Sequence, residues 1–263
     1  MVRHPSAMIR AVLLDLSGVV YDGDTPVPGA VAAIGRLREA GLPVRFVSNT
    51  TRSPHAAILR RLDSLGVSAG HDDLFTPARA AVEWLSRENC VPHLLVHPDL
   101  VPEFAGNEFG DRKAVVVGDA ADAFTYGTMN AAFRQLVDGA EFLALATNRT
   151  FKDADGRLSL DAGAFVAALE FAAGKQATVL GKPARDFFRS AFAGLGCTPG
   201  QAVMVGDDAE SDVAGALKAG IGAGLLVRTG KYRAGDESRF APHPTAVVED
   251  LAAAVDWVLA HRG

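Results

Sequence analysis

The feature that most constrains the fold is a short apolar run that stops at an acid, Ala11-Val-Leu-Leu-Asp15, followed by Leu16, Ser17 and Gly18. The run is too short for a helix, and its composition predicts a strand buried on both faces of a parallel sheet. Asp15 would then stand at the carboxyl end of that strand, the edge at which open α/β sheets bind ligands. A carboxylate is costly to bury there unless a metal or a reaction requires it.

The same pattern returns three times along the chain, where an apolar segment of strand length runs into polar residues. These segments are Val44 to Val47 before Ser48, Asn49 and Thr50; Ala177 to Gly181 before Lys182; and Val203 to Gly206 before Asp207 and Asp208. We expect all four strands to lie in one core sheet, because the carboxyl ends of parallel strands meet at a single edge. The acids, the lysine and the neutral donors would then gather in one site.

The middle of the chain has an α/β pattern of its own. Strand-like runs near 94, 115 and 142 alternate with helices expected at 79–87, 126–137 and 162–173. We therefore predict a doubly wound, mostly parallel, Rossmann-like α/β core formed by residues 1–78 and 178–263. Residues 79–177 would form an inserted α/β domain.

Composition narrows the classes of function. The 263 residues are 49% hydrophobic, which is enough for a sizeable core, and the formal net charge is −5. An acidic chain argues against broad binding to nucleic acid or to membranes, so any phosphate should be bound locally. Cys90 and Cys197 are too few and too far apart for a disulfide framework or a thiolate metal site. No apolar run reaches membrane-spanning length, and we expect a cytoplasmic protein that is not exported.

The side chains at the strand ends indicate phosphoryl transfer assisted by a metal ion. Asp15, Asp207 and a main-chain carbonyl after Asp15 form an oxygen-only donor set, which suits Mg²⁺. Lys182 supplies a positive charge, and Ser48 and Asn49 supply neutral donors to a phosphoryl group. A carboxylate beside such a group can attack phosphorus, giving an aspartyl phosphate that water then cleaves.

In these motifs the chain resembles the haloacid dehalogenase superfamily of phosphatases. The family's four motifs are matched in order by Asp15-Leu16-Ser17-Gly18, by the strand ending at Ser48, by Lys182, and by Gly206-Asp207 with Asp212. The inserted domain lies where class II members of that family carry an α/β cap. The sequence Leu16-Ser17-Gly18 is most similar to that of the phospholysine phosphohistidine inorganic pyrophosphate phosphatase branch and of the related hydrolase-domain proteins.

The resemblance implies roles for the acidic residues. Asp15 would be the nucleophile and a Mg²⁺ ligand, and Asp207 would be a second ligand. Ser17 would lend its main-chain carbonyl to the metal. Either Asp208 or Asp212 would orient the metal shell, and the sequence does not separate the two.

The resemblance also implies how a small phosphorylated substrate is held. Lys182 would neutralise Asp15 and the transferred phosphoryl group, and the cap would contact the leaving group and close over the site. The substrate-binding residues would be Ser48, Asn49, Thr50 and Lys182 in the phosphate site, and Asn148 and Arg149 in the cap. Because caps of this type can self-associate, a homodimer formed through the cap is a further expectation.

Ser17 departs from the pattern of the resembled family. Most of its phosphatases have a second aspartate there, which protonates the leaving oxygen and later activates water. A serine hydroxyl does neither near neutral pH, and general acid–base catalysis contributes about 10² to 10⁴ in rate. We therefore expect a preference for good leaving groups, as in pyrophosphate, acyl phosphates and phosphoramidates. Asp22 and Asp24, in the polar stretch after the first strand, are alternative sources of the acid.

Two other classes of function stay open. Ser17 could mark a catalytically weak, phosphate-responsive binding protein that uses the cap to recruit a partner. A receiver phosphorylated on aspartate is a weaker alternative, because such proteins lack a cap of this size. Phosphate release with Mg²⁺ that is abolished by Asp15→Asn would favour the enzyme.

Overall fold

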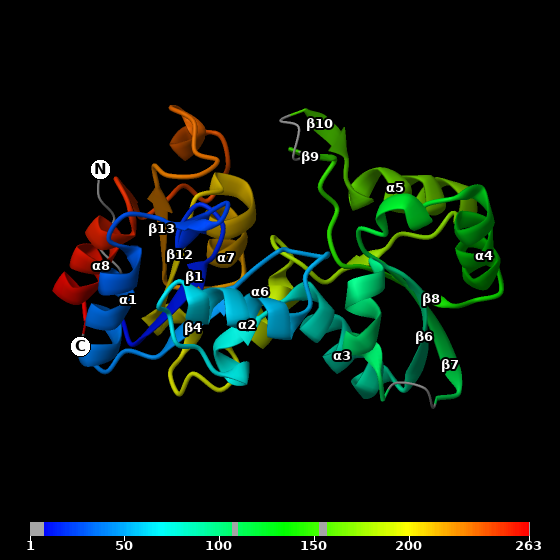
Figure 1. Ribbon diagram of the computed structural model, residues 1–263, viewed down its shortest axis with the longest axis horizontal. Helices are drawn as coiled ribbons and strands as arrows, with labels where there is room; N and C mark the ends of the chain where they lie inside the picture. The colour runs from blue at the N-terminus through cyan, green and yellow to red at the C-terminus, as the bar shows by residue number, and fades with distance from the viewer. Residues whose placement is uncertain (1–7, 107–109, 153–156, 263) are drawn as a thin grey trace. The chain divides into compact units, whose positions relative to one another are not determined.

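The computed structural model describes residues 8–106, 110–152 and 157–262, and its chain contacts divide it into two compact units (Figure 1). The first unit comprises Met1–Ser48, Ile58–Phe75 and Lys182–Gly263; the second comprises Asn49–Ala57 and Thr76–Gly181. Both ends of the chain therefore contribute to the first unit. The domain boundaries expected from the sequence, after residues 78 and 177, stay predictions.

The first unit is built on a six-stranded parallel sheet in the order β14-β13-β12-β1-β4-β5. Its strands are β1 (Ala11–Asp15), β4 (Val44–Val47), β5 (Leu74–Phe75), β12 (Ala202–Gly206), β13 (Ala223–Val227) and β14 (Ala246–Val248). The order runs outward from β1 in both directions, so the boundary between β1 and β12 is the topological switch point, where open α/β sheets bind ligands. Leu14 pairs with Val205 across this boundary, which brings the carboxyl ends of the two strands together.

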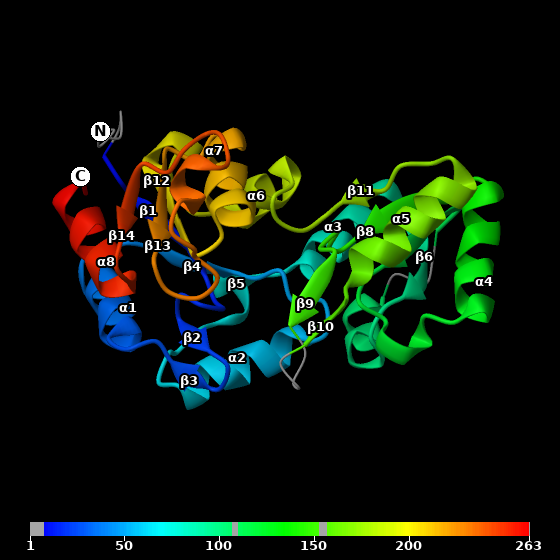
Figure 2. The ribbon, with the colours of Figure 1, turned by 90° about the horizontal axis from the view of Figure 1, so that it is seen from above.

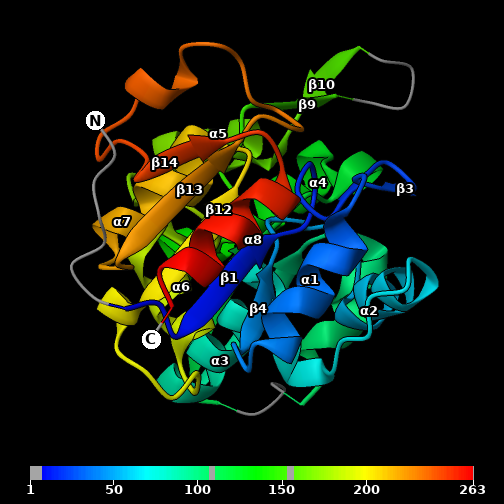
Figure 3. The same cartoon turned by 90° about the vertical axis from the view of Figure 1, so that its left-hand side faces the viewer.

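Helices cover both faces of this sheet. On one face, α1 (Ala30–Glu39) and α8 (Leu251–Ala260) lie side by side and share a core with alternate residues of β1 and β13 (Figure 3). On the other face, η5 (Ala209–Ala214) packs on Leu226 and leads into α7 (Gly215–Lys218). Every residue of β1, β12 and β13 is buried, as near-continuous apolar strands of a covered parallel sheet require.

The first unit also contains short elements around the sheet. A hairpin of β2 (Tyr21–Asp22) and β3 (Thr25–Pro26) follows β1 within ten residues. The remaining elements are α6 (Arg185–Phe192) and the single turns η1 (His71–Asp73), η4 (Pro199–Gln201) and η6 (Asp236–Ser238). Helix α2 (His55–Ser64) spans a boundary between the two units. Its residues up to Ala57 belong to the second unit, and those from Ile58 onward belong to the first.

The second unit is built on a four-stranded parallel sheet in the order β11-β8-β7-β6; Figure 2 labels β11, β8 and β6. Its strands are β6 (Cys90–Leu95), β7 (Arg112–Val117), β8 (Glu141–Ala144) and β11 (Thr178–Val179), and a separate hairpin is formed by β9 (Thr150–Lys152) and β10 (Leu158–Leu160). Its helices are α3 (Pro77–Glu88), α4 (Tyr126–Val137) and α5 (Ala162–Ala173), with the short turns η2 (Pro98–Phe104) and η3 (Ala121–Ala123). Helices α4 and α5 bury Leu136 and Val166 with Val115 of the sheet.

The predicted fold class, a mostly parallel α/β protein, is confirmed. One strand is not where we expected it: β11, which precedes Lys182, pairs with β8 in the second unit and is not part of the core sheet. The reason is that a strand of only two residues, Thr178 and Val179, can join either sheet, and its composition does not specify which. No helix within the described ranges is long and apolar enough to cross a bilayer.

Candidate active site

Lys182 joins two acids in the interior of the first unit. Its Nζ donates hydrogen bonds to Oδ1 of Asp15 at 2.5 Å and to Oδ1 of Asp212 at 2.6 Å. All three side chains are buried, with at most 9% of any of them exposed. Asp15 ends β1, and Asp212 lies in η5, so residues from both ends of the chain meet here.

Asp207 adds a third carboxylate to this group. One carboxylate oxygen from each of Asp15, Asp207 and Asp212 lies within 4.8 Å of the others. Asp207 directly follows β12, and the pairing of β12 with β1 places it beside Asp15. Asp212 also closely approaches the main chain of Gly206, where a Cβ would lie 2.3 Å from the Cβ of Asp212. We call Asp15, Asp207, Asp212 and Lys182 the acidic cluster.

Burial and neighbouring charges together shift the pKa values of the acidic cluster. Burial, assisted by the charge of Asp15, raises the pKa of Asp207 to about 6. Burial raises the pKa of Asp212 to about 8, against the opposing effect of Lys182. Burial by itself would lower the pKa of Lys182, but Asp15 and Asp212 outweigh it, and the pKa of the ammonium group is raised. Lys182 is therefore protonated, while the acids repel one another.

The acidic cluster fits a divalent cation. It contains three carboxyl groups and one ammonium group, and besides burial, which is the largest cause, the charge of Asp15 raises the pKa values of Asp207 and Asp212. The carboxylates offer only oxygen ligands, which are the donors preferred by Mg²⁺. Asp15 and Asp207 could thus be ligands of such an ion, and Asp212 lies close enough to both to orient them.

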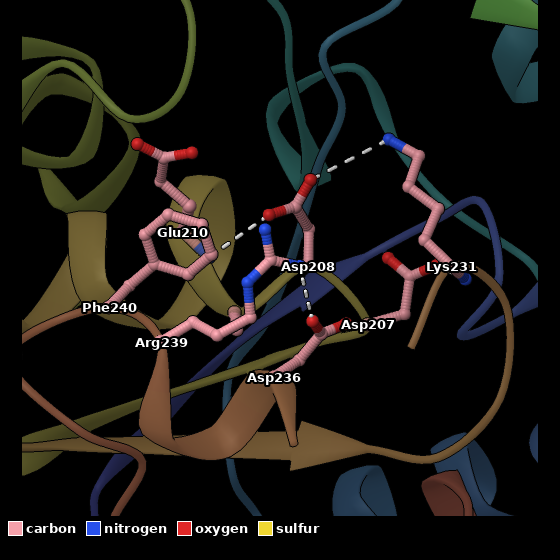
Figure 4. A pocket seen from close by; sticks show the side chains of 8 residues that line it. Asp207, Asp208, Glu210, Lys231, Asp236, Arg239 and Phe240 are labelled. Atoms are coloured by element: carbon pink, nitrogen blue, oxygen red, sulfur yellow. Dashed lines mark hydrogen bonds and ion pairs between the residues drawn. The ribbon is translucent and has the colours of Figure 1, made fainter. Parts of the chain in front are cut away.

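Asp208 has a different environment from Asp212. Its Oδ1 accepts hydrogen bonds from the main-chain N–H groups of Glu210 and Ser211, so it caps the start of η5. Its Oδ2 lies 3.8 Å from Nζ of Lys231, across a pocket of about 220 Å³ that Asp207 also lines (Figure 4). Of the two acids that the sequence did not separate, the structure brings Asp212 into the acidic cluster.

Ser17 was predicted to lend its carbonyl to the metal, and Ser48, Asn49 and Thr50 were predicted to bind phosphate. Ser17 comes two residues after Asp15 with an exposed side chain, and its main chain bridges to Tyr21. Ser48 is buried after β4 and donates its main-chain N–H to the carbonyl of Phe75 at 3.1 Å. Asn49 and Thr50 are counted with the second unit, and their role in phosphate binding stays a prediction.

The predicted leaving-group residues lie in a surface turn of the second unit. Asn148 and Arg149 are exposed, and their carbonyls accept hydrogen bonds from the N–H groups of Gly163 and Asp161, respectively. A Cβ at Gly163 would lie 2.5 Å from the carbonyl oxygen of Asn148, so the turn requires a glycine there. The contact of this turn with a leaving group stays a prediction.

Sequence reasoning missed one contributor to the site, the segment Thr229-Gly230-Lys231. The main-chain N–H of Lys231 donates a hydrogen bond to Oδ2 of Asp207 at 2.7 Å. The signal was available, since β13 is another apolar strand that ends in polar residues and a glycine.

The doubly wound sheet with its lysine and acids at the switch point defines the class, and the chain belongs to the haloacid dehalogenase-like hydrolases. The family model described as haloacid dehalogenase-like hydrolase matches residues 12–123, and a related one described as HAD-hydrolase-like matches residues 179–254. The family resemblance drawn from the sequence is confirmed.

Individual relatives cover nearly the whole chain. Human haloacid dehalogenase-like hydrolase domain-containing protein 2 is 45% identical over 253 residues, which cover 96% of this chain and 97% of the relative. The phospholysine phosphohistidine inorganic pyrophosphate phosphatase of Danio rerio is 41% identical over 261 residues, covering 97% and 96%. Among solved structures, a glycerol phosphate phosphatase of Mycobacterium tuberculosis in complex with magnesium matches with a TM-score of 0.82 and 28% identity, over 96% of this chain and 78% of that one.

Proposed function

We propose that the chain is a Mg²⁺-dependent phosphatase that works through an aspartyl phosphate on Asp15. The observation that carries this proposal is the pair of hydrogen bonds by which Lys182 joins Asp15 to Asp212 inside a group of three acids. A salt bridge kept only for stability would not need two surplus buried carboxylates, because their mutual repulsion opposes folding. The names of the relatives, which include phosphatases, support the same activity.

The chemistry of the chain's own residues follows from their positions. A carboxylate oxygen of Asp15 forms a bond to phosphorus, and the bond from phosphorus to the leaving oxygen or nitrogen breaks with its electron pair going to the leaving group. Lys182, held within hydrogen-bonding distance of Asp15, offsets the negative charge on the transferred group. Water then attacks the phosphoaspartate, which releases inorganic phosphate and restores Asp15.

The metal would be held by Asp15, Asp207 and the main-chain carbonyl of Ser17, with Asp212 orienting this set. When bound, Mg²⁺ would neutralise the excess charge of the carboxylates and of the phosphoryl group. The magnesium complex of the Mycobacterium tuberculosis phosphatase supports this choice of ion.

The substrate class follows from Ser17. Because its hydroxyl cannot protonate a poor leaving group near neutral pH, we infer that the enzyme prefers pyrophosphate, acyl phosphates or phosphoramidates. The name of the Danio rerio relative, with pyrophosphate and two phosphoramidates in it, supports this inference. Ser48, Asn49 and Thr50 would hold the phosphoryl group, and the turn with Asn148 and Arg149 would contact the leaving group.

Phosphate release from pyrophosphate and from p-nitrophenyl phosphate, measured with and without MgCl₂, tests the proposal. We expect release that requires the metal and that falls by at least about 10³-fold in Asp15→Asn, because the nucleophile is lost. Asp63→Asn, which changes an exposed aspartate of α2, is the matched control and should leave the rate unchanged. Full activity in Asp15→Asn would contradict the proposal, and a wild-type protein that binds phosphate without turnover would favour a phosphate-responsive binding protein.

A further inference from the structure

A turn after β13 contacts the carboxylate of Asp207 and donates a hydrogen bond to it. β13 pairs in parallel with β12, with Leu226 opposite Gly206, so the chain leaving β13 passes directly beside Asp207. Figure 4 shows Lys231 and Asp207 next to each other at the edge of the pocket. We call Thr229, Gly230 and Lys231 the glycine turn.

Two glycines enclose the carboxylate of Asp207. Gly230 in the glycine turn and Gly18 after β1 have φ angles of +62° and +80°, a region that residues with a side chain rarely adopt. A Cβ would lie 2.0 Å from Oδ2 of Asp207 if built on Gly230, and 2.2 Å from the same atom if built on Gly18. The carboxylate therefore has room only because both positions lack a side chain.

Hydrogen bonds fix the glycine turn to both Asp207 and the loop after β1. The main-chain N–H of Lys231 donates to Oδ2 of Asp207 at 2.7 Å, and the hydroxyl of Thr229 donates to the carbonyl of Gly18. The Cα of Gly230 lies only 2.8 Å from where a Cβ on Gly18 would be. Oδ2 of Asp207 thus accepts a hydrogen bond from the glycine turn and is enclosed by Gly18 and Gly230.

We propose that the glycine turn positions Asp207 for metal binding. The turn holds Oδ2 of Asp207, so that the other carboxylate oxygen faces Asp15 and Asp212. The last side-chain torsion of aspartate is soft, so an unrestrained carboxylate would rotate and lose affinity for the ion. Groups that orient a metal ligand typically change metal affinity by about 10- to 100-fold when removed. The proposal rests on the proposed function only in taking Asp207 as a metal ligand.

The test compares two glycines of the same loop by titrating the metal-free protein with MgCl₂ alone in a calorimeter. Gly230→Ala places a methyl group against Asp207 and should weaken Mg²⁺ binding by at least about tenfold. Gly235→Ala is the matched control, since Gly235 also has a positive φ of +97° but has nothing within 4 Å of its added Cβ. The affinity of Gly235→Ala for Mg²⁺ should stay within about twofold of wild type, because this variant has the same backbone strain as Gly230→Ala but no contact with Asp207.

A second variant keeps the proposal testable if Gly230→Ala does not fold. Thr229→Val preserves the side chain's shape and removes the hydrogen bond to Gly18, and it should weaken Mg²⁺ binding by about three- to tenfold. Wild-type affinity in a folded Gly230→Ala, or in Thr229→Val, would overturn the positioning role.

Asp207→Asn separates this result from a failure of the proposed function. If Asp207→Asn binds Mg²⁺ as tightly as wild type, Asp207 is not a ligand and the proposed metal site is wrong. If Asp207→Asn loses binding while the glycine-turn variants keep it, the metal site stands and the positioning role alone is overturned.

Discussion

Nζ of Lys182 lies 2.5 Å from Oδ1 of Asp15, although 167 residues separate the two along the chain. The same ammonium group also reaches Asp212, so one cation is shared between the proposed nucleophile and an acid of η5. Any change to this lysine should therefore alter both chemistry and folding stability.

Lys182→Met should reduce both the rate of phosphate release and the folding stability. Removing one partner of a buried ion pair typically destabilises a protein by about 3–5 kcal/mol, because the remaining charge stays buried without compensation. Urea unfolding measures this loss, and phosphate release should fall by at least about 10²-fold, because the charge on the phosphoryl group is no longer offset. Lys218→Met, at an exposed position of α7, is the control and should change neither measurement. Stability equal to wild type in Lys182→Met would contradict the electrostatic account.

Stabilisation by Mg²⁺ should depend on pH. The pKa values of Asp207 and Asp212 are raised from 3.8 to about 6 and about 8, so the folded protein retains protons that the unfolded chain releases. The metal-free protein should therefore lose stability as pH rises from about 4 to about 8. Mg²⁺ binds ionised carboxylates, so the rise in Tm on adding MgCl₂ should be larger near the top of this range than near pH 5. Differential scanning calorimetry measures both trends, and an equal rise in Tm at the two pH values would argue against the prediction.

Ser17→Asp should broaden the substrate range. The new carboxylate would supply the missing acid, so hydrolysis of a sugar phosphate should increase by about 10²-fold or more. Hydrolysis of pyrophosphate should change much less, because its leaving group needs little protonation. The ratio of kcat/KM values on the two substrates gives the result. Fast sugar-phosphate hydrolysis by the unmodified protein would remove the basis of this prediction.

Asp24 should not replace the missing acid. Its side chain is fully exposed and forms an ion pair with Arg61 at 3.0 Å, and Arg61 also lies over the ring of Tyr21 at 4.3 Å. Asp24→Asn should therefore keep kcat within about threefold, a change far below that expected for a general acid. A pH–rate profile of this variant gives the decisive measurement, since loss of the basic limb, where a general acid becomes deprotonated, would show that Asp24 does donate the proton.

The parts of the site that follow strand ends could be predicted from the sequence. Asp15 is the last residue of β1 and Asp207 directly follows β12, and the pairing of these two apolar strands brings the two acids together. Lys182 was also expected in the site, but the strand before it belongs to the other sheet, because a two-residue pairing is decided by tertiary context.

Other parts depend on local geometry that a residue pattern does not contain. Asp208 and Asp212 are equivalent by type and differ only because Asp208 caps the helical turn while Asp212 faces Lys182. The role of Gly230 depends on its positive φ and on its separation from Asp207, neither of which is visible in the sequence.

The position of β1 between β4 and β12 has a consequence for biosynthesis. Ala11 pairs with Ala202, and at about 5–20 residues per second the ribosome needs roughly 10–40 s to make the chain between them. Throughout that interval one edge of β1 lacks its permanent neighbour and is open to wrong pairing with other nascent chains. Competence for phosphate chemistry thus arises only after Asp207 and Asp212 have been synthesised and have left the exit tunnel.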